Sequence, residues 1–245
     1  MLIYISDLKE SFFKNDILFY IDEQSYLSYF PEDTTGPKFV PDKLHERYKK
    51  AVEEAIKLYP YGLVPLNIGK VYILEGSLEN GEWVGVFVGD IFIGVEENYD
   101  SFLIESIFHH EFCHALQDYS FFDYNNLFNS YKAEWASINP AGFEYLGYEW
   151  FKNDKTIYDD KSWIKLLQDG FIRPYSKVNY EEDFADIAEA AFSNENDKQF
   201  LKMLKDYPKL RQKFELMVDF YNKIDPAFNM EYFEKLSGQK LEPSK

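Results

Sequence analysis

Cysteine is almost absent from this chain, since Cys113 is the only one among 245 residues. A single thiol excludes an intramolecular disulfide and any metal site built from several cysteines. Histidine is also scarce: the chain has four, and three of them lie between positions 109 and 114. Any histidine-based site is therefore expected in that short segment.

Positive charge is the second shortage. The chain has 26 Lys and Arg residues against 43 Asp and Glu, which gives a formal net charge of −17. A surface this acidic repels phosphate backbones, so we expect no nucleic-acid partner. Anionic membrane surfaces are disfavoured for the same reason. Neutral or basic partners, such as peptides and proteins, remain compatible with this charge.

Long hydrophobic runs are missing as well. No segment approaches the about 20 apolar residues that a membrane-spanning helix needs, so we expect no membrane insertion. The first ten residues, MLIYISDLKE, do not form a basic region followed by a long apolar one, so we expect no signal peptide in this chain. The expected location is cytoplasmic, or exported if the chain is a processed form.

What the chain does contain is apolar and aromatic. Hydrophobic residues make up 46% of it, which is typical of a globular protein. Aromatic residues reach 19%, with 20 Tyr and 23 Phe. This enrichment indicates either an aromatic-rich core or an aromatic-lined cleft, and composition alone does not choose between them. The length fits one domain over residues 1–245.

The pattern of apolar residues predicts an α+β fold. Residues 1–100 are expected to form a mixed lobe, with strands at Ile17–Ile21 and Lys70–Leu74, a helix at Pro41–Tyr59, and a hairpin of Trp83–Val88 and Ile91–Val95. Residues 101–245 are expected to be mostly helical and to carry the site. The helices predicted there are Ser101–Tyr119, Asn129–Ser137, Ser162–Asp169, Glu181–Phe192, Asp197–Tyr207, Lys209–Ile224 and Met230–Leu236. Asn139–Tyr148 is expected to be irregular.

The first of these helices contains an HExxH motif. His110 and His114 are four residues apart, so on a helix both imidazoles lie on one face and can reach one ion. Glu111 follows the first histidine and sits about 100° around the helix, beside such an ion. Two imidazoles with an adjacent carboxylate are typical of Zn²⁺ sites in which the carboxylate is the general base for a metal-activated water.

The neighbouring residues are interpreted as structural. Cys113 lies between the motif residues and is expected to be buried and to pack the helix. His109 does not begin an HExxH motif, and we interpret it as a surface histidine or one that supports a ligand. His45 lies on a charged helix face and is expected to be solvated.

A catalytic zinc site needs a third protein ligand. The continuation HExxHxxGxxH is excluded because Gln117 and Ser120 occupy its glycine and histidine positions, and no histidine follows His114. The third ligand must then be Asp or Glu, and two candidates stand out. Glu182 is favoured, and Glu134, 20 residues after His114, is the alternative.

The residues around Glu182 favour it. Glu182 and Asp186 share one face of a predicted helix, so one can bind the metal while the other accepts the N–H of a ligand histidine. Tyr175 lies seven residues before Glu182, and its phenol could donate to a developing oxyanion. The structural alternative is an acidic first turn that complements the helix dipole.

These motifs resemble a known family. The segment Phe108–Ala115 resembles the HEFGHA-type helix of the anthrax lethal factor catalytic domain. The Pro-Pro endopeptidases have a similar arrangement of motifs. A closer resemblance is to zinc-binding metallopeptidases, often lipoproteins, with a GFxxxYA segment before an EDFAE helix. The matching residues here are Gly170–Ser176 and Glu182–Ala185, and Asn139–Phe143 also resembles that family.

The resemblance implies a zincin-like fold of the gluzincin type, in which a small mixed sheet packs on the HExxH helix beside a helical lobe. It implies zinc ligands at His110, His114 and Glu182, Glu111 as the general base, and Tyr175 as the oxyanion donor. Three features depart from the pattern: Cys113 replaces a glycine, Asp186 replaces a glutamate, and Glu182 lies 68 positions after His114, a longer spacing than in the toxin.

The expected function is that of a zinc metallopeptidase, an endopeptidase, with Zn²⁺ as cofactor and a peptide or protein as substrate. Zincins hold substrate along an edge strand beside the HExxH helix, and Ile91–Val95 or Trp83–Val88 is the candidate strand. A non-catalytic, zinc-containing binding or toxin-like module is the alternative. Hydrolysis of a non-peptide amide or ester is a third interpretation.

Overall fold

The computed structural model describes residues 18–19, 23–34, 36, 38–40, 42–78, 83–118, 124–156, 158–193 and 197–241. The chain divides into two compact units, Met1–Phe121 and Phe122–Lys245. The helix Ser101–Asp118 (α5) belongs to the first unit, whereas the sequence placed it in the helical half, because it packs on the sheet and on an earlier helix of that unit. The assignment of both units to one domain stays a prediction.

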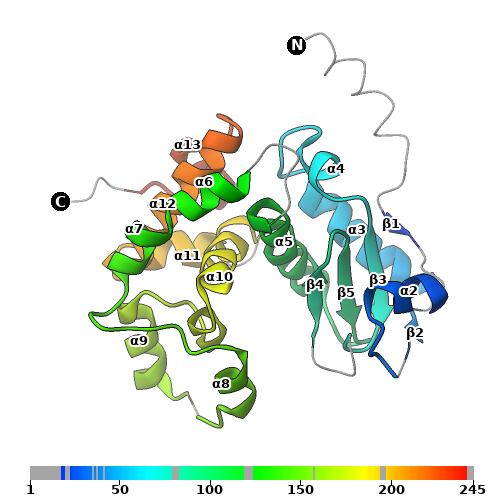
Figure 1. The fold of residues 1–245 in the computed structure, drawn as a ribbon. Helices are drawn as coiled ribbons and strands as arrows, with labels where there is room; N and C mark the ends of the chain where they lie inside the picture. The colour runs from blue at the N-terminus through cyan, green and yellow to red at the C-terminus, as the bar shows by residue number, and fades with distance from the viewer. Residues whose placement is uncertain are drawn as a thin grey trace. The chain divides into compact units, whose positions relative to one another are not determined.

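A small mixed sheet organises the first unit (Figure 1). Its strand order is β1-β3-β5-β4, and β2 pairs with β3. β3 runs parallel to β1 and β5, whereas β4 runs antiparallel to β5. The strands are β1 (Leu18–Phe19), β2 (Lys38–Phe39), β3 (Val71–Glu75), β4 (Gly85–Phe87) and β5 (Ile91–Val95).

Helices cover both faces of this sheet, with α2 on one side and α3 and α5 on the other (Figure 1). On the α2 side, Tyr72 and Phe92 stack with ring centroids 4.8 Å apart, and Val86 packs against the same cluster. Neighbouring strand residues point to opposite faces, so Gly85 and Ile93 face α5. The helices of this unit are α2 (Glu23–Tyr29), α3 (Asp42–Ile56), α4 (Leu63–Asn67) and α5.

The predicted hairpin is confirmed, with a first strand shorter than expected. Gly89 lies in its turn with φ of 93°, a conformation that favours glycine. One interpretation was wrong: Ile91–Val95 cannot accept a substrate strand, because β3 and β4 already pair with its two sides. Among the described strands, β4 pairs with β5 alone and keeps an open edge beside α5.

The second unit is helical. The predicted helix Asn129–Ser137 is instead two helices, because the chain turns at Tyr131. The elements are α6 (Tyr124–Ser130), α7 (Lys132–Ile138), α8 (Tyr148–Asn153), α9 (Asp160–Asp169), η2 (Pro174–Lys177), α10 (Tyr180–Phe192), α11 (Asp197–Met203), α12 (Pro208–Ile224) and α13 (Met230–Ser237). The short helices α8 and η2 were not predicted, and α8 begins at the last residue of the segment expected to be irregular, Asn139–Tyr148.

Aromatic side chains fill the core of the second unit. Phe128 stacks on Tyr180 at 4.5 Å, and Trp135 lies 4.6 Å from Phe184. Phe220 of α12 meets Phe184 edge-on at 5.3 Å. Such offset and edge-on pairs add about 0.5–1.5 kcal/mol each beyond the area they bury. The aromatic-core interpretation is confirmed here, and the core fixes α10 against α7 and α12.

A buried ion pair also fixes α10. Lys213 donates to Asp183 at 2.7 Å and to the carbonyl oxygen of Gly170 at 2.8 Å. The same Asp183 oxygen accepts from Trp135 and Tyr145, both at 2.8 Å. Burial raises the pKa of Asp183 and lowers that of Lys213, so each group holds its charge because of the other.

Replacing Lys213 by methionine is expected to destabilise the chain by about 3–5 kcal/mol, because it leaves the Asp183 carboxylate buried without its cation. Chemical denaturation measures this change. The control is Lys223→Met, whose pair with Asp219 is half exposed on both sides. Such pairs contribute at most about 1 kcal/mol. Equal losses in the two variants would show that the buried pair does not hold α10.

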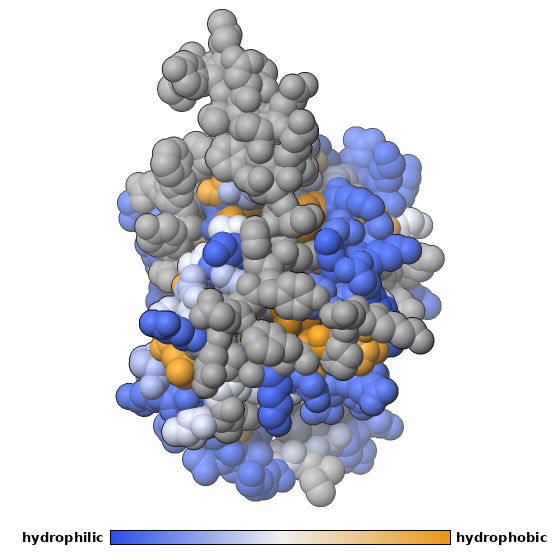
Figure 2. Space-filling model, turned by 90° about the vertical axis from the view of Figure 1, so that its right-hand side faces the viewer, coloured by the Kyte–Doolittle hydropathy of each residue, from blue (hydrophilic) through white to orange (hydrophobic). Residues whose placement is uncertain are grey.

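No helix among the described residues combines the length and the apolar character that a membrane crossing needs. The face drawn in Figure 2 is mostly hydrophilic where its residues are described, and apolar residues appear on it in smaller groups.

Candidate metal centre

The HExxH motif lies in the second half of α5. The helix begins after Asp100, whose carboxylate accepts from the backbone N–H of Leu103 at 2.8 Å. Phe108 and Phe112 are fully buried, and the ring of Tyr59 meets Phe112 edge-on at 4.7 Å. This packing fixes the rotation of α5 about its axis, and with it the direction of the motif side chains.

His110 and His114 are brought together as the spacing predicts. Their Nε2 atoms lie 3.1 Å apart. Nδ1 of His114 lies 2.8 Å from Oε1 of Gln117, and Nε2 of Gln117 donates to Sγ of Cys113 at 3.5 Å. With the amide held in this orientation, His114 must donate from Nδ1. Its Nε2 then presents a lone pair toward His110.

Glu182 lies in the first turn of α10, in the second unit. The side chain of Asn179 caps this helix by accepting from the backbone N–H of Glu182 at 2.7 Å. Glu181 and Asp183 share the turn, so three carboxylates complement the helix dipole there. The structural interpretation of the acidic turn therefore applies whether or not Glu182 also binds a metal.

A tyrosine that the sequence did not single out holds Glu182. Tyr148, the first residue of α8, donates a short hydrogen bond to the Glu182 carboxylate. Asn179 donates to the same phenol at 3.4 Å. Burial and the charge of Glu182 raise the pKa of Tyr148, so its hydroxyl stays protonated and remains a donor. The sequence gives no signal for this contact beyond its richness in tyrosine, because nothing distinguishes Tyr148 from the other tyrosines among the 20 in the chain.

Tyr175 and Asp186 are linked through their neighbours within the same unit. The Asp186 carboxylate accepts from Arg173 through one oxygen and from Ser176 through the other, the latter at 2.6 Å. Arg173 also pairs with Glu189 at 2.7 Å. These contacts fasten η2, which carries Tyr175, to α10, which carries Glu182. Both oxygens of Asp186 thus have partners inside the second unit.

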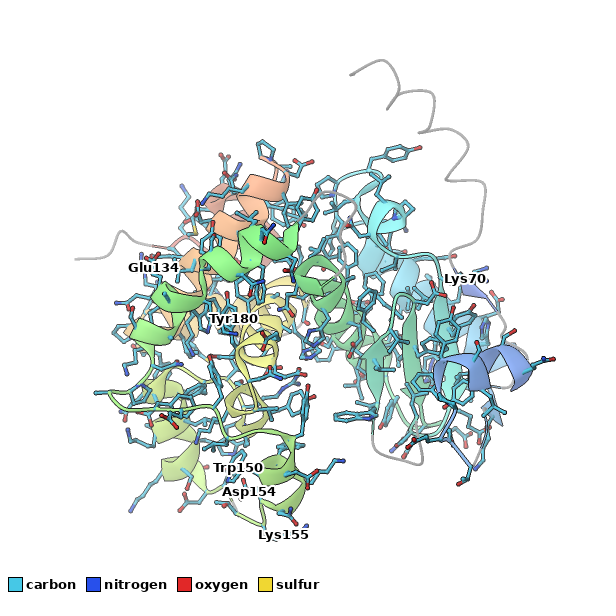
Figure 3. The ribbon with its side chains drawn as sticks, viewed as in Figure 1. Lys70, Glu134, Trp150, Asp154, Lys155 and Tyr180 are labelled. Carbon is cyan, nitrogen blue, oxygen red and sulfur yellow. The ribbon has the colours of Figure 1, made fainter. Side chains whose placement is uncertain are left out.

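Glu134, the alternative third ligand, lies on α7 and is exposed. Figure 3 labels it there, together with Tyr180 at the first residue of α10. The adjacent Trp135 points into the core and donates to Asp183, which directs Glu134 toward solvent. Within the second unit, Glu134 and Glu182 therefore have opposite surroundings.

A family model described as "Putative zinc-binding metallo-peptidase" matches residues 55–226, more than half of the chain. The chain belongs to this family. A crystal structure of a putative zinc-binding metallo-peptidase from Bacteroides caccae is 14% identical, covers 90% of this chain and 94% of its own, and has a TM-score of 0.47. No curated protein matches the chain.

The family match spans both the HExxH helix and α10, so it includes all the candidate site residues. The relation to lethal factor and the Pro-Pro endopeptidases that the motifs suggested stays a prediction. So do the individual roles of His110, Glu111 and His114 in the first unit, and those of Tyr175, Glu182 and Asp186 in the second.

The histidine pair fits the zinc that the family name implies. The Nε2 atoms lie 3.1 Å apart, so two neutral imidazoles can share one proton there or can both turn a lone pair toward one cation. Imidazole nitrogen is a preferred ligand for Zn²⁺, and His114 already has the Nδ1 partner typical of metal-bound histidines. His110 and His114 would therefore hold the ion from the first unit.

Gln117 contacts the ring of His114, which the sequence did not predict. In the sequence this position only served to exclude the HExxHxxGxxH motif. Gln117→Ala is expected to weaken zinc binding by about 10–100-fold, since the carbonyl that orients His114 is lost. Competition with a chromogenic chelator measures the affinity. Gln117→Glu keeps an acceptor for Nδ1–H and should bind zinc at least as tightly as the wild type. Equal weakening in both variants would contradict this role.

The other two histidines are buried. For His109 this rules out the surface alternative, while a role in supporting a ligand stays a prediction; its Nδ1 lies 2.8 Å from the hydroxyl of Tyr59. Burial lowers the pKa of His109 to about 3, so it is neutral near pH 7. His45 is also buried rather than solvated. Cys113 is buried, as predicted.

Proposed function

We propose that the chain is a zinc-dependent endopeptidase of the metallopeptidase family to which it belongs. The observation that carries the proposal is the pair of imidazole Nε2 atoms 3.1 Å apart on α5, with Glu111 between the two histidines in sequence. A carboxylate in that position suits a general base. The proposed fold is zincin-like, of the gluzincin type.

In this proposal Glu182 of the second unit joins His110 and His114 as the third ligand. Two features of α10 support the choice. The capped helix start stabilises the charged carboxylate, and Tyr148 orients it by a hydrogen bond. Glu134 also lies in the first turn of a helix, but α7 is short and its start has no side-chain cap. Asp186 is proposed to accept from the N–H of a ligand histidine, in addition to its contacts with Arg173 and Ser176.

Zinc held by two imidazoles and a carboxylate supplies a Lewis acid for water and for the scissile carbonyl. Glu111 accepts a proton from the attacking water and delivers it to the nitrogen of the leaving amine. The hydroxyl of Tyr175 donates to the carbonyl oxygen as negative charge develops on it. Tyr148 keeps Glu182 in place through its protonated hydroxyl.

The substrate is proposed to bind along β4. This strand has an open edge among the described strands and lies against α5, which carries Glu111. An extended peptide can add to such an edge through main-chain hydrogen bonds, which hold it without selecting a sequence. Residues 84 and 88, both valines, flank the strand and are exposed, so they would contact substrate side chains.

A diverse peptide library incubated with the purified protein tests this proposal, with mass spectrometry to find new termini. The expected result is internal cleavage that a chelator stops. Bound zinc without any cleavage would favour the non-catalytic binding or toxin-like module. Cleavage of an ester or a non-peptide amide alone would favour the third interpretation.

A further inference from the structure

The strand β4 carries a glycine at the position that faces the HExxH helix. Gly85 pairs with Ile93 of β5, and its neighbour Val86 packs on the opposite face of the sheet. A Cβ atom at Gly85 would lie 2.6 Å from Oε1 of Glu111. It would also lie 2.6 Å from Cγ2 of Ile107, one helical turn before Glu111. Both distances are far inside the 3.4 Å at which ordinary van der Waals contact begins.

The backbone does not explain this glycine. Positive φ values occur at other glycines of the described chain, such as Gly76 and Gly89, but Gly85 is not among them. Gly85 lies in a strand and its φ is not positive, so its backbone conformation is open to any L-residue. What the position requires is space, because the Glu111 carboxylate and the Ile107 side chain occupy the place where a side chain would be.

We propose that Gly85 is a positioning residue for the general base: the missing side chain lets the Glu111 carboxylate lie directly against the edge strand. The inference rests on the proposed function, in which the peptide lies along this same strand. A base held against the strand is held beside the peptide bond to be cleaved. A larger residue at position 85 would turn the carboxylate away from that place, and neither histidine supplies any of the three atoms nearest to the added Cβ.

The direct test is the variant Gly85→Ala, compared with the wild type on a peptide that the wild type cleaves. The expected result is a fall in kcat of about 100-fold, since displacement of a reacting group by about 1 Å costs that much. The zinc content should stay at the wild-type value, because His110 and His114 are not displaced. A kcat equal to that of the wild type would overturn the inference.

Gly69→Ala is the matched control for general crowding in the same unit. Its Cβ would lie 2.8 Å from Oδ1 of Asp90, another carboxylate, and would not approach α5. This variant should lose stability in the same way but keep its kcat. If it loses kcat as strongly as Gly85→Ala, crowding of the sheet alone explains the effect, and the inference fails.

A second variant covers the case in which Gly85→Ala does not fold. Adding Ile107→Ala removes one of the two collisions and leaves the one with Glu111. The double variant should fold and bind zinc, yet its kcat should remain about 100-fold below that of Ile107→Ala alone. Equal kcat values in these two variants would overturn the inference.

A double-mutant cycle in thermal stability separates this inference from the proposed function. Gly85→Ala should cost less stability in a Glu111→Ala background, because the colliding carboxylate is gone. If the cycle shows this coupling but the wild type cleaves nothing, the proposed function fails, while the close approach of Glu111 to Gly85 is confirmed. If the wild type cleaves peptides but the cycle shows no coupling, the positioning role of Gly85 fails.

Discussion

Replacing Glu111 by glutamine is expected to lower kcat/KM by about 10²–10⁴-fold while zinc binding is kept, because the amide cannot accept the proton of the attacking water. Glutamine has nearly the size of glutamate, so the side chain at position 111 can still lie against Gly85. Steady-state kinetics on a peptide found in the library, together with metal analysis, measure both effects on the same sample.

Glu105→Gln is the control, since Glu105 lies on the same helix, two residues before Ile107 and outside the HExxH motif. It should cleave at nearly the wild-type rate. Wild-type activity in Glu111→Gln would mean that another group is the base. Loss of zinc in that variant would mean that Glu111 supports the metal site and not the proton transfer.

Replacing Glu182 by alanine is expected to weaken zinc binding by more than the about 10–100-fold that loss of a supporting residue costs, because a direct ligand disappears. Glu134→Ala should leave the affinity unchanged, since that carboxylate is exposed on α7. Titration of both variants against a chelator of known affinity measures the difference. The reverse result would make Glu134 the third ligand.

Tyr148→Phe refines this comparison. The variant removes the hydroxyl that holds Glu182 and leaves the carboxylate itself in place. Its loss of zinc affinity should lie between those of Glu134→Ala and Glu182→Ala. A weakening as large as that of Glu182→Ala would indicate that the phenol contributes more than orientation.

The sequence predicted the two helices that carry the candidate site almost to the residue. α5 is a long apolar segment and α10 has an apolar face, and each helix has a clear start, Asp100 before one and Asn179 before the other. Local signals of this kind act over one or two turns, so they can be recognised without knowledge of the fold. The HExxH spacing has the same local character, which is why the Nε2 pair was expected.

What the sequence did not predict depends on long-range packing. The sequence left the surface alternative for His109 open, because nothing near it in the chain shows that Tyr59, fifty residues earlier, contacts it. The contact of Tyr148 with Glu182 joins residues 34 positions apart, and Tyr148 ends the segment that was expected to be irregular. The inner position of Ile91–Val95 follows from its pairing with β3, which sequence patterns do not specify.

The most direct test of the central claim is a titration of the zinc-stripped protein with Zn²⁺ while cleavage of an identified peptide is followed. We expect no cleavage without zinc, and a rate that rises until about one zinc per chain is bound and then levels off. Cleavage that persists in the stripped protein, or a stripped protein that binds zinc and still cleaves nothing, would contradict the claim.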